Sequence, residues 1–349
     1  METVLEWKDY SLSFYMPDGE VEAVRGVNLS LKKGEILALV GESGCGKSVL
    51  CKSVMKLLPS YGKVKNGQIL LNGTDITHLS QRQMRKYRGK DAAMVFQDPM
   101  TSLNPTVPVG KQIMNAVLSH EHISKEAAKD RAMELMHLAN IPDPEMRFSM
   151  QPHFFSGGMR QRCVLAIALA GNPEILFADE PTTALDVTVQ AKILDLLLSI
   201  REKTGISIIF VSHDLGVVAR IADRIAVMYA GRIIEYGTAQ DIFYDPRHPY
   251  TWGLLSAMPS RAKKGDELYS IPGMPPVLMN LPKGDPFAPR NAYALAIDYE
   301  QEPGMYQISE THSAATWLLD PRAPRLSPPQ GIGRMGGSDG MGNRGNTYE

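Results

Sequence analysis

One stretch of sequence decides the fold of this chain, the octapeptide Gly41-Glu42-Ser43-Gly44-Cys45-Gly46-Lys47-Ser48. It fits the phosphate-loop pattern G-x-x-x-x-G-K-[S/T] at every position. The apolar run 35–40 before it predicts a buried strand, and residues 48–55 after it predict a helix. Because the pattern requires this strand–loop–helix context, the sequence predicts a nucleotide site.

The residue types in the loop explain how it would hold phosphate. Glycines let backbone N–H groups turn toward the phosphate oxygens, and the helix N-terminus adds its positive dipole end. Lys47 is expected to reach the β- and γ-phosphates, and the Ser48 hydroxyl to ligate Mg²⁺. The alternative is a glycine-rich turn that matches by accident, and the flanking strand and helix argue against it.

Composition narrows the function class. The chain has 349 residues, 44% hydrophobic and 21% charged, with a formal net charge of −1. These values are typical of a globular enzyme, and they give no basic field, so we expect no nucleic-acid partner. The three cysteines form no C-x-x-C pair, which excludes a cysteine-based zinc site and argues against a disulfide framework. A reducing, cytosolic location is expected.

Membrane contact is expected only through other proteins. Residues 1–6 are acidic and carry no apolar signal core. No apolar run approaches the ~20 residues that a membrane-spanning helix needs. Any work at a membrane therefore requires partners.

The predicted fold class is α/β, a layered P-loop NTPase. Alternating apolar and polar residues over 4–40 and 67–73 predict a small antiparallel sheet beside the loop. Residues 98–155 read as a helical insertion, and α/β alternation returns from residue 160. Residues 321–349 are rich in Gly and Pro and poor in apolar residues, so we expect a disordered tail.

Two acids end a buried strand predicted at Ile175–Ala178. The carboxyl ends of strands in such sheets face the ligand. Asp179 is placed to hold Mg²⁺ through water, and Glu180 to orient and deprotonate an attacking water. A strand capped by solvated acids is the alternative, and the phosphate loop upstream makes it less favoured.

A second glycine-rich stretch, Phe155–Arg162, precedes a predicted helix. Ser156 is a plausible cap, and Gly157 and Gly158 allow close backbone approach. A phosphate loop, then Ser-Gly-Gly-x-x-Gln ending at Gln161, then the Asp-Glu pair, resembles the ATPase subunit of an ABC transporter. The family pattern begins Leu-Ser-Gly-Gly-Gln, whereas this chain has phenylalanine and methionine at its first and fifth positions; both departures are mild, since serine and the glycine backbone make the phosphate contacts.

The remaining marks of that family occur in its order. Gln97 matches the glutamine loop, Asp186 the D-loop and His213 the switch histidine. Phe14 or its neighbour Tyr15 stands where the family stacks an aromatic ring on adenine. The resemblance implies roles in hydrolysis for Gln97 and His213, Mg²⁺ ligation by Gln97, and ATP contact for the others. Taken alone, each of these residues also has an ordinary structural explanation: Gln97 as a loop residue, Asp186 as a helix cap, His213 as a histidine at a strand end, and Phe14 as a core residue.

The resemblance further implies a head-to-tail ATPase dimer. ATP on Lys47 of one chain would be covered by Ser156–Gly158 of the other. Hydrolysis would break this contact, and Gln97 with the helical insertion would transmit closure to a membrane partner. We expect Pro99–Pro105, taken as exposed, to make that contact.

The residues after the ATPase core narrow the resemblance. The segments 245–255, 271–276 and 286–290 look like the dipeptide/oligopeptide/nickel importer family. We therefore expect an ATPase domain over 1–260 and an importer-type segment over 261–320. The implied partners are two membrane-spanning permease subunits, a second ATPase that is a paralogue or this chain itself, and, indirectly, an extracytoplasmic binding protein. The implied location is the cytoplasmic face of the cell membrane, as a peripheral protein.

Three alternatives stay open. One is a nickel or other small-solute importer of the same family. Another is a non-transport ABC ATPase in nucleic-acid maintenance, which would need zinc-spaced cysteines or long heptad arms, both absent here. An exporter ATPase is nearer, but such subunits stop soon after the switch region or are fused to membrane spans.

Missing and present cysteines give two further predictions. Many members of this family have cysteines in the C-terminal segment similar to iron–sulfur ligands, whereas this chain has Asp285, Asn291 and Asp298 at the matching positions. Because thiolates are the usual cluster ligands, we expect no cluster. Asp285 and Asp298 are expected to be solvated loop acids, and the alternative is that they bind a hard metal ion. Apolar contacts should then hold the segment, with these candidates: Phe287, Tyr293, Leu295, Ile297, Trp317 and Leu318. Cys45 is expected to be accessible to alkylation without nucleotide and shielded with it.

Overall fold

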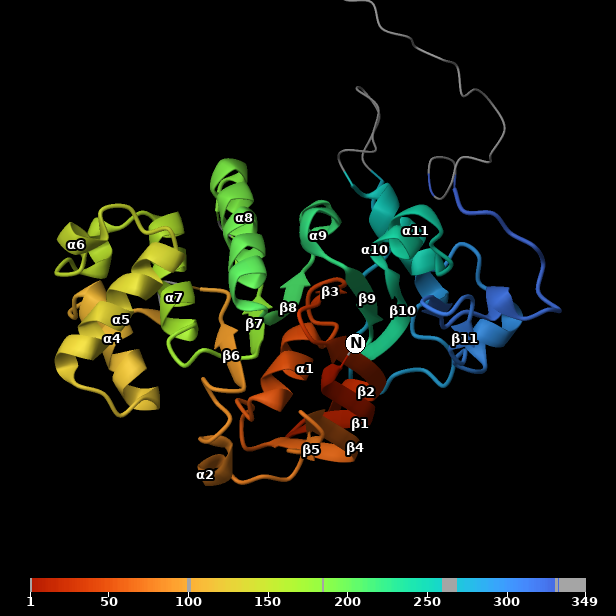
Figure 1. Ribbon diagram of the computed structural model, residues 1–349. Helices are drawn as coiled ribbons and strands as arrows, with labels where there is room; N and C mark the ends of the chain where they lie inside the picture. Colours follow the sequence, from red (N-terminus) through yellow and green to blue (C-terminus); the bar gives the residue numbers. More distant parts are fainter. Residues whose placement is uncertain (1, 99–101, 184, 259–268, 330–331, 333–349) are drawn as a thin grey trace, which may run out of the picture.

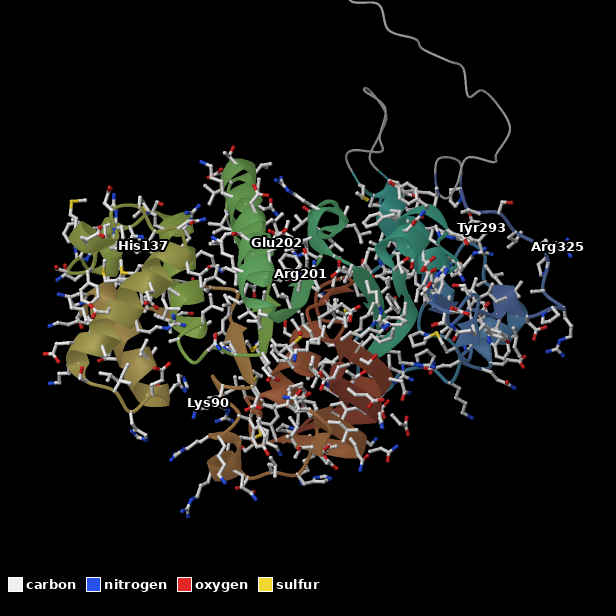
Figure 2. The ribbon with its side chains drawn as sticks, viewed as in Figure 1. Lys90, His137, Arg201, Glu202, Tyr293 and Arg325 are labelled. Atoms are coloured by element: carbon white, nitrogen blue, oxygen red, sulfur yellow. The ribbon has the colours of Figure 1, made fainter. Side chains whose placement is uncertain are left out.

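Two sheets and a set of helices build the chain (Figure 1), and Figure 2 shows the side chains that these elements carry in the same view. The computed structural model describes residues 2–98, 102–183, 185–258, 269–329 and 332. Its strands are β1 (Thr3–Met16), β2 (Gly19–Lys32), β3 (Ile36–Val40), β4 (Gly62–Leu71), β5 (Thr74–Asp75), β6 (Ala92–Val95), β7 (Ile175–Asp179), β8 (Ser207–Ser212), β9 (Arg224–Tyr229), β10 (Arg232–Thr238), β11 (Tyr306–Gln307) and β12 (Ser313–Ala314).

The helices follow the predicted alternation. The α-helices are α1 (Lys47–Val54), α2 (Gln81–Met84), α4 (Val109–His120), α5 (Lys125–Leu138), α6 (Pro144–Arg147), α7 (Gly157–Ala168), α8 (Val187–Thr204), α9 (Leu215–Ile221), α10 (Ala239–Tyr244) and α11 (Pro249–Ser256). The 3-10 helices are η1 (Pro152–Phe154), η3 (Ala288–Arg290), η4 (Ala296–Tyr299) and η5 (Trp317–Leu319).

The larger sheet positions the phosphate loop. Its strand order is β11-β12-β10-β9-β3-β8-β7-β6, parallel from β9 to β6 and antiparallel at the β10–β12 end. All five residues of β3 are buried because each face of the strand packs into an apolar cluster, Ile36, Ala38 and Val40 into one and Leu37 and Leu39 into the other. The short strands β11 and β12 come from the C-terminal segment, so this segment extends the core sheet.

The smaller sheet has the order β2-β1-β4-β5 and is antiparallel, as its alternating pattern predicted. Its buried face, with Trp7 and Leu12, shares one apolar cluster with Leu37 and Leu39 of β3 and with Leu50 of α1. The cluster therefore packs the small sheet against the helix that leaves the phosphate loop.

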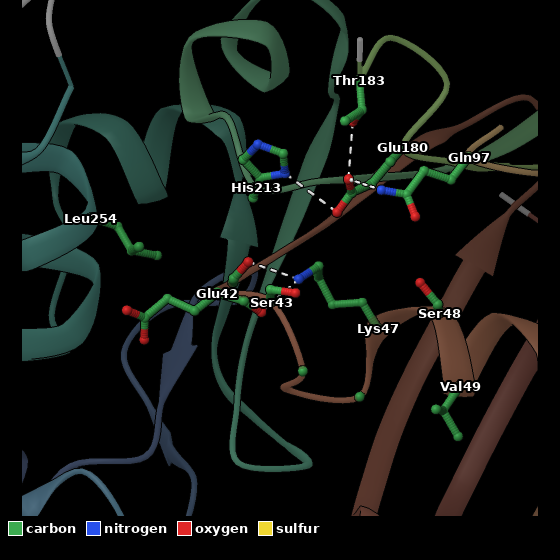
Figure 3. Close-up of a pocket in the computed structure, with 13 residues that line it drawn as sticks. Glu42, Ser43, Lys47, Ser48, Val49, Gln97, Glu180, Thr183, His213 and Leu254 are labelled. Atoms are coloured by element: carbon green, nitrogen blue, oxygen red, sulfur yellow. Dashed lines mark hydrogen bonds and ion pairs between the residues drawn. The ribbon is translucent and has the colours of Figure 1, made fainter. Parts of the chain in front are cut away.

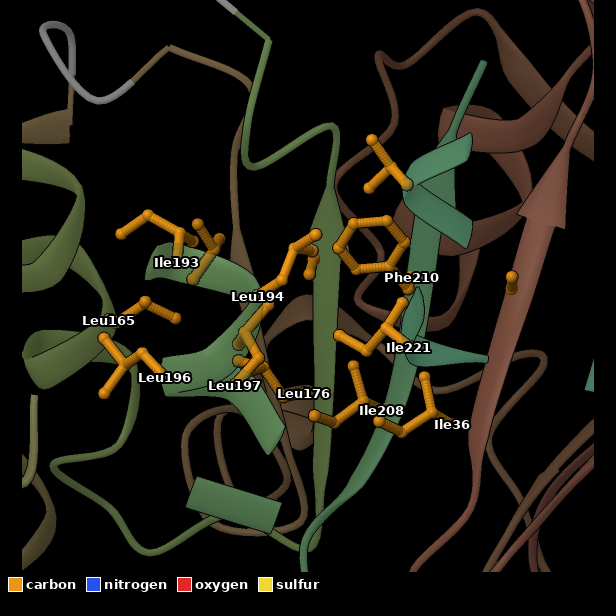
Figure 4. Packing of buried hydrophobic residues seen from close by; sticks show 14 of the residues in the cluster. Ile36, Leu165, Leu176, Ile193, Leu194, Leu196, Leu197, Ile208, Phe210 and Ile221 are labelled. Carbon is orange, nitrogen blue, oxygen red and sulfur yellow. The ribbon is translucent and has the colours of Figure 1, made fainter. Parts of the chain in front are cut away.

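A second apolar cluster includes the other side of the large sheet. Leu194 and Leu197 of α8 lie in it with Leu176 of β7 and Ile208 and Phe210 of β8 (Figure 4). The helical insertion is confirmed, because α4, α5 and α6 occupy much of residues 98–155, and α4 and α5 pack beside α7 (Figure 1). Asp186 caps α8 by accepting a hydrogen bond from the Val189 N–H at 2.9 Å.

Two predictions about surface segments meet different outcomes. The segment Pro99–Pro105 was expected to be exposed; residues 99–101 lie outside the described part, and Leu103 is buried. The expectation is confirmed for Ser102, Asn104 and Pro105, which are exposed. It is wrong for Leu103, because its side chain joins the apolar cluster that also contains residues of the helical insertion. Most of the tail 321–349 lies outside the described residues. Among the described helices, none is long and apolar enough to cross a membrane.

Candidate active site

Glycines shape the loop between β3 and α1. Gly41 has φ +151°, and a Cβ atom there would lie 2.2 Å from the Met228 carbonyl oxygen. Gly46 has φ +108°, and its Cβ would lie 2.3 Å from the Ala23 carbonyl oxygen. Any other residue at these two positions would collide with backbone. The loop conformation therefore depends on glycine, as the sequence pattern requires.

The side chain of Lys47 folds back against the start of the phosphate loop. Its Nζ atom donates hydrogen bonds of 2.8 Å to the carbonyl oxygens of both Gly41 and Glu42, and the residue is 5% exposed (Figure 3). These two bonds hold the ammonium group in the mouth of the loop. A phosphate in the loop would meet a positive charge that is already positioned and largely desolvated.

Ser48 joins the loop to the acidic end of β7. Its Oγ donates a 2.7 Å hydrogen bond to Asp179 Oδ1, and Lys52 Nζ lies 4.0 Å from Asp179 Oδ2. Burial raises the pKa of Asp179, and the Ser48 hydrogen bond and the Lys52 charge oppose this rise. A hydroxyl and a carboxylate are hard oxygen ligands, which fit Mg²⁺. Mg²⁺ at a nucleotide site takes only one or two protein ligands beside the phosphate oxygens, so Ser48 and Asp179 are a suitable pair of ligands for it.

Glu180 is held by three side chains from different loops. Its Oε2 accepts hydrogen bonds from Gln97 Nε2 at 3.1 Å and Thr183 Oγ1 at 2.9 Å. Its Oε1 lies 3.3 Å from His213 Nδ1 (Figure 3). Its backbone has φ +48°, a left-handed conformation that is unusual for glutamate and typical of functional sites. The structure thus brings Glu180, Gln97 and His213 together.

A cavity of about 610 Å³ connects these groups. It is lined by Gly41, Glu42, Ser43, Gly44, Gly46, Lys47, Ser48, Val49, Gln97, Glu180, Thr183, His213 and Leu254. Sequence reasoning missed Thr183, although its position three residues after Glu180 was a usable signal. It also missed Leu254, which reaches the cavity from α11, a helix distant in sequence.

The second glycine-rich stretch lies on another surface of the same chain. Ser156 caps α7 by accepting from the Met159 N–H at 3.4 Å, and it is exposed together with Gly157. A Cβ atom on Gly158 would lie 2.4 Å from Val189 Cγ1, so this helix packing requires glycine. Gln161 is buried, and within the described residues its Nε2 has no hydrogen-bond partner. None of these four residues lines the cavity of its own chain.

The two aromatic candidates lie outside the residues that line the cavity. Phe14 is partly buried and meets Tyr61 edge to face, with ring centroids 5.6 Å apart. Tyr15 is 45% exposed, and Lys63 Nζ lies 5.6 Å from its ring centroid. Tyr15 is therefore the ring with a free face toward solvent.

The expectation that Cys45 is accessible is wrong. The residue is 6% exposed, and its Sγ lies 3.7 Å from Lys47 Nζ inside the loop. Burial raises the pKa of its thiol, although the Lys47 charge opposes the rise. The side chain faces the protein interior because the glycines on either side turn the backbone, not the side chain, toward the cavity.

The expectation of solvated acids in the C-terminal segment is also wrong. Asp285 and Asp298 are 7% and 2% exposed. Each carboxylate accepts from a nearby backbone N–H, Asp285 from Phe287 and Asp298 from Leu295. Their short side chains stabilise turns from inside the fold, which explains why they are buried.

Comparison with known proteins agrees with this geometry. Residues 24–183 match the family model described as ABC transporter, and residues 234–297 match the model described as oligopeptide/dipeptide transporter, C-terminal region. The chain is 59% identical over 331 residues to the oligopeptide transport ATP-binding protein OppD of Bacillus subtilis, covering 94% of this chain and 92% of that protein. This chain belongs to the ATP-binding proteins of the oligopeptide and dipeptide ABC transporters.

Further similarities fit this family. The chain is 53% identical over 332 residues to the dipeptide transport ATP-binding protein DppD of Lactococcus lactis, covering 95% of each chain. Among solved structures it is similar to the dimeric, post-hydrolysis ATP-binding cassette MJ0796 bound to ADP and phosphate. That match has a TM-score of 0.60 and 27% identity, and it covers 67% of this chain and 98% of the other. The P-loop ABC ATPase fold and an ATP-hydrolysing subunit, both expected from sequence, are confirmed.

Proposed function

We propose that this chain hydrolyses ATP to power the import of dipeptides or oligopeptides across the cytoplasmic membrane. The observation that carries the proposal is one cavity holding Lys47, Ser48 and Glu180, in a chain whose relatives are named for peptide transport. The C-terminal match favours this substrate class. The alternative of nucleic-acid maintenance finds no support in these similarities.

Glu180 is the group proposed to activate water. Its carboxylate lies at the end of a buried strand beside the phosphate loop and touches Gln97 and His213. We assign Glu180 as general base and His213 and Gln97 as the residues that orient it and the water. A positioned base of this kind typically contributes about 10²–10⁴-fold in rate.

Mg²⁺ is proposed as the metal. Ser48, Asp179 and Gln97 supply hydroxyl, carboxylate and amide oxygens at the site. When bound, the ion would neutralise charge on the β- and γ-phosphates. No iron–sulfur cluster is proposed, since the C-terminal segment contains no cysteine.

The second chain at the site is proposed to be a related ATPase, or a second copy of this one. Ser156 and Asp186 lie exposed at the starts of α7 and α8, and Val187 beside Asp186 is 81% exposed. The similar cassette MJ0796 is dimeric in its solved structures, which supports an interface there. In it, Ser156–Gly158 and Asp186 would face the ATP of the partner chain; the burial of Gln161 argues that it supports them rather than touching ATP.

The remaining partners are two membrane-spanning permease subunits and, through them, an extracytoplasmic binding protein. This places the chain at the cytoplasmic face of the membrane as a peripheral protein. The aromatic side chain that stacks on adenine is proposed to be Tyr15, which is exposed, or Phe14, which is partly buried. Gln97, at the mouth of the helical insertion, would link ATP contact to the permease.

The test is substrate-stimulated ATPase activity of the reconstituted transporter. The full-length chain is assembled with its permeases, second ATPase and binding protein in liposomes, and a Lys47→Ala complex serves as the control. Dipeptides or oligopeptides should stimulate hydrolysis several-fold in the wild-type complex only. Stimulation by Ni²⁺ and not by any peptide would replace peptide import with nickel import.

A further inference from the structure

The C-terminal segment contacts the phosphate loop directly. Arg290 lies in η3, after the ATPase motifs, and its guanidinium forms an ion pair with Glu42, the second residue of the loop. Arg290 Nη1 donates to Glu42 Oε2 at 2.6 Å, and Nη2 donates to Glu42 Oε1 at 2.9 Å. Both oxygens of the carboxylate are thus held by one fork.

The fork itself is fixed from the other side. Arg290 Nε donates to the Pro272 carbonyl at 2.8 Å, Nη1 also reaches the Tyr229 hydroxyl at 3.3 Å, and Nη2 reaches the Gly273 carbonyl at 3.5 Å. With the two bonds to Glu42, these contacts use all five N–H donors of the guanidinium. The side chain is 5% exposed. Such a group has one orientation, set by the segment around it.

Glu42 is held at two further points. Its backbone N–H donates to the Tyr250 hydroxyl at 2.9 Å, and its carbonyl accepts from Lys47 Nζ at 2.8 Å. The loop residue that positions the Lys47 ammonium is therefore the same residue that Arg290 anchors. Figure 3 shows the Glu42 side chain directed away from Lys47, toward the side where Leu254 lies.

The ion pair between Arg290 and Glu42 affects the charge that the triphosphate of ATP would meet at the loop. Glu42 lines the cavity, and an unpaired carboxylate there would repel the anionic triphosphate. The carboxylate is 25% exposed, so water screens it only in part. The bidentate contact with Arg290 neutralises the charge of the Glu42 carboxylate and keeps this carboxylate directed away from Lys47.

We propose that Arg290 is a positioning residue for ATP, by which the C-terminal segment neutralises Glu42 and sets the affinity of the phosphate loop. The contact joins the two regions that match separate family models. A change that withdraws the segment would leave the catalytic groups in place and weaken ATP binding. The inference rests on ATP hydrolysis at this loop.

The experiment uses the full-length chain and measures KM and kcat for ATP together with ATP affinity by calorimetry. Arg290→Met should raise KM about tenfold while kcat changes less than about threefold. Arg290→Lys keeps the charge without the fork, and its KM should rise about threefold. The control is Arg322→Ala, an arginine of the same region whose side chain is 87% exposed and pairs only with Asp320 among the described contacts; its KM should not change.

A double variant separates the charge effect from general loosening of the fold. Glu42→Gln in the Arg290→Met chain removes the unpaired carboxylate, so KM should return to within about threefold of wild type. A double variant whose KM for ATP is as high as that of Arg290→Met would overturn the proposal. An Arg290→Met or Arg290→Lys chain with the wild-type KM would overturn it as well. If Arg290→Met does not fold, the lysine variant still decides. A wild-type chain that fails to hydrolyse ATP would instead refute the proposed function.

Discussion

The hydroxyl of Ser48 donates a 2.7 Å hydrogen bond to Oδ1 of Asp179, which joins the first turn of α1 to the carboxyl end of β7. The two residues are 131 positions apart in sequence. The central sheet places both strand ends at one edge, so the loop and the acid meet there. This contact is the structural basis for assigning the metal.

Replacing Ser48 with alanine should weaken the use of Mg²⁺. The variant loses one hard ligand and the bond that orients Asp179, so we expect kcat/KM to fall at least about tenfold, most strongly at low Mg²⁺. ATPase activity titrated with Mg²⁺ measures this. Ser53→Ala is the matched control, because Ser53 lies on the same helix and its Oγ donates to the Leu50 carbonyl at 2.6 Å, not to Asp179. An unchanged Mg²⁺ dependence in Ser48→Ala would remove Ser48 from the site.

Alkylation of Cys45 should be slow with or without ATP. Burial both blocks the thiol and raises its pKa, so little thiolate forms at neutral pH, and the rate should keep rising above pH 9.0, the ordinary thiol value. Peptide mapping by mass spectrometry after iodoacetamide treatment from pH 7 to 10 distinguishes Cys45 from Cys51 and Cys163, which are also buried. Glutathione is the exposed reference. Modification of Cys45 at pH 7 as fast as that of glutathione would contradict the buried placement.

Glu235 should be important for stability. The residue is fully buried in β10, and its carboxylate accepts from the backbone N–H groups of Arg247 at 2.6 Å and His248 at 3.1 Å and lies 2.9 Å from His312 Nε2. Glu235→Gln replaces one acceptor oxygen with an NH₂ group that faces these donors. We expect a loss of about 3 kcal/mol in the free energy of unfolding, measured in urea.

The control for Glu235 is an exposed glutamate. Glu134 is 65% exposed and pairs with Arg131 at 2.7 Å on the surface of α5. Its replacement by glutamine should cost less than about 1 kcal/mol. A Glu235→Gln chain no less stable than Glu134→Gln would show that the contacts of Glu235 with Arg247, His248 and His312 do not stabilise the fold.

Asp285 should destabilise the chain at neutral and alkaline pH. Burial, together with the charges of Asp298 and Glu302, raises the pKa of its carboxyl to about 6, although the hydrogen bond from the Phe287 N–H and the charge of Arg232 oppose the rise. Between the ordinary pKa and 6 the folded chain binds more protons than the unfolded chain, so this group favours folding as pH falls and opposes it above pH 6. Asp285→Asn keeps an oxygen for the Phe287 N–H and should add up to about 3 kcal/mol at pH 8.

The same variant should have no advantage at pH 4, where Asp285 is protonated in the folded chain. Thermal unfolding of wild type and Asp285→Asn at pH 4 and pH 8 makes the comparison. Asp320→Asn provides the opposite case, because its hydrogen bonds with Arg322 lower the pKa of this carboxyl to about 2. Equal stabilisation by Asp285→Asn at both pH values would contradict a buried, titrating acid.

The parts of the fold that could be predicted are those with a local signature. The loop Gly41–Ser48, the strand ending at Asp179 and the helix after Asp186 each follow from their own residues, and the structure has them within one or two positions. Ser156 was likewise identified as a cap from its place before a helix. Capping and strand burial act over a few residues, so sequence carries them.

The parts that could not be predicted depend on contacts between distant segments. Arg290 meets Glu42 across 248 positions, and nothing near either residue indicates the other. Whether Cys45 faces the cavity or the core depends on distant segments, because Ala23 and Met228 lie against the adjacent Gly46. The sequence around Asp285 predicted a solvated acid, whereas tertiary packing buries its side chain. These details are decided by the packing of the C-terminal segment on the core.

Hydrolysis of ATP by Glu180→Gln is the most direct test of the account. The full-length chain is mixed with radiolabelled ATP in a single turnover, and ATP binding is measured separately by calorimetry. The account predicts unchanged binding and hydrolysis slowed by about 10²–10⁴-fold, since glutamine keeps the contact with Thr183 but cannot take a proton. Hydrolysis at the wild-type rate would contradict it.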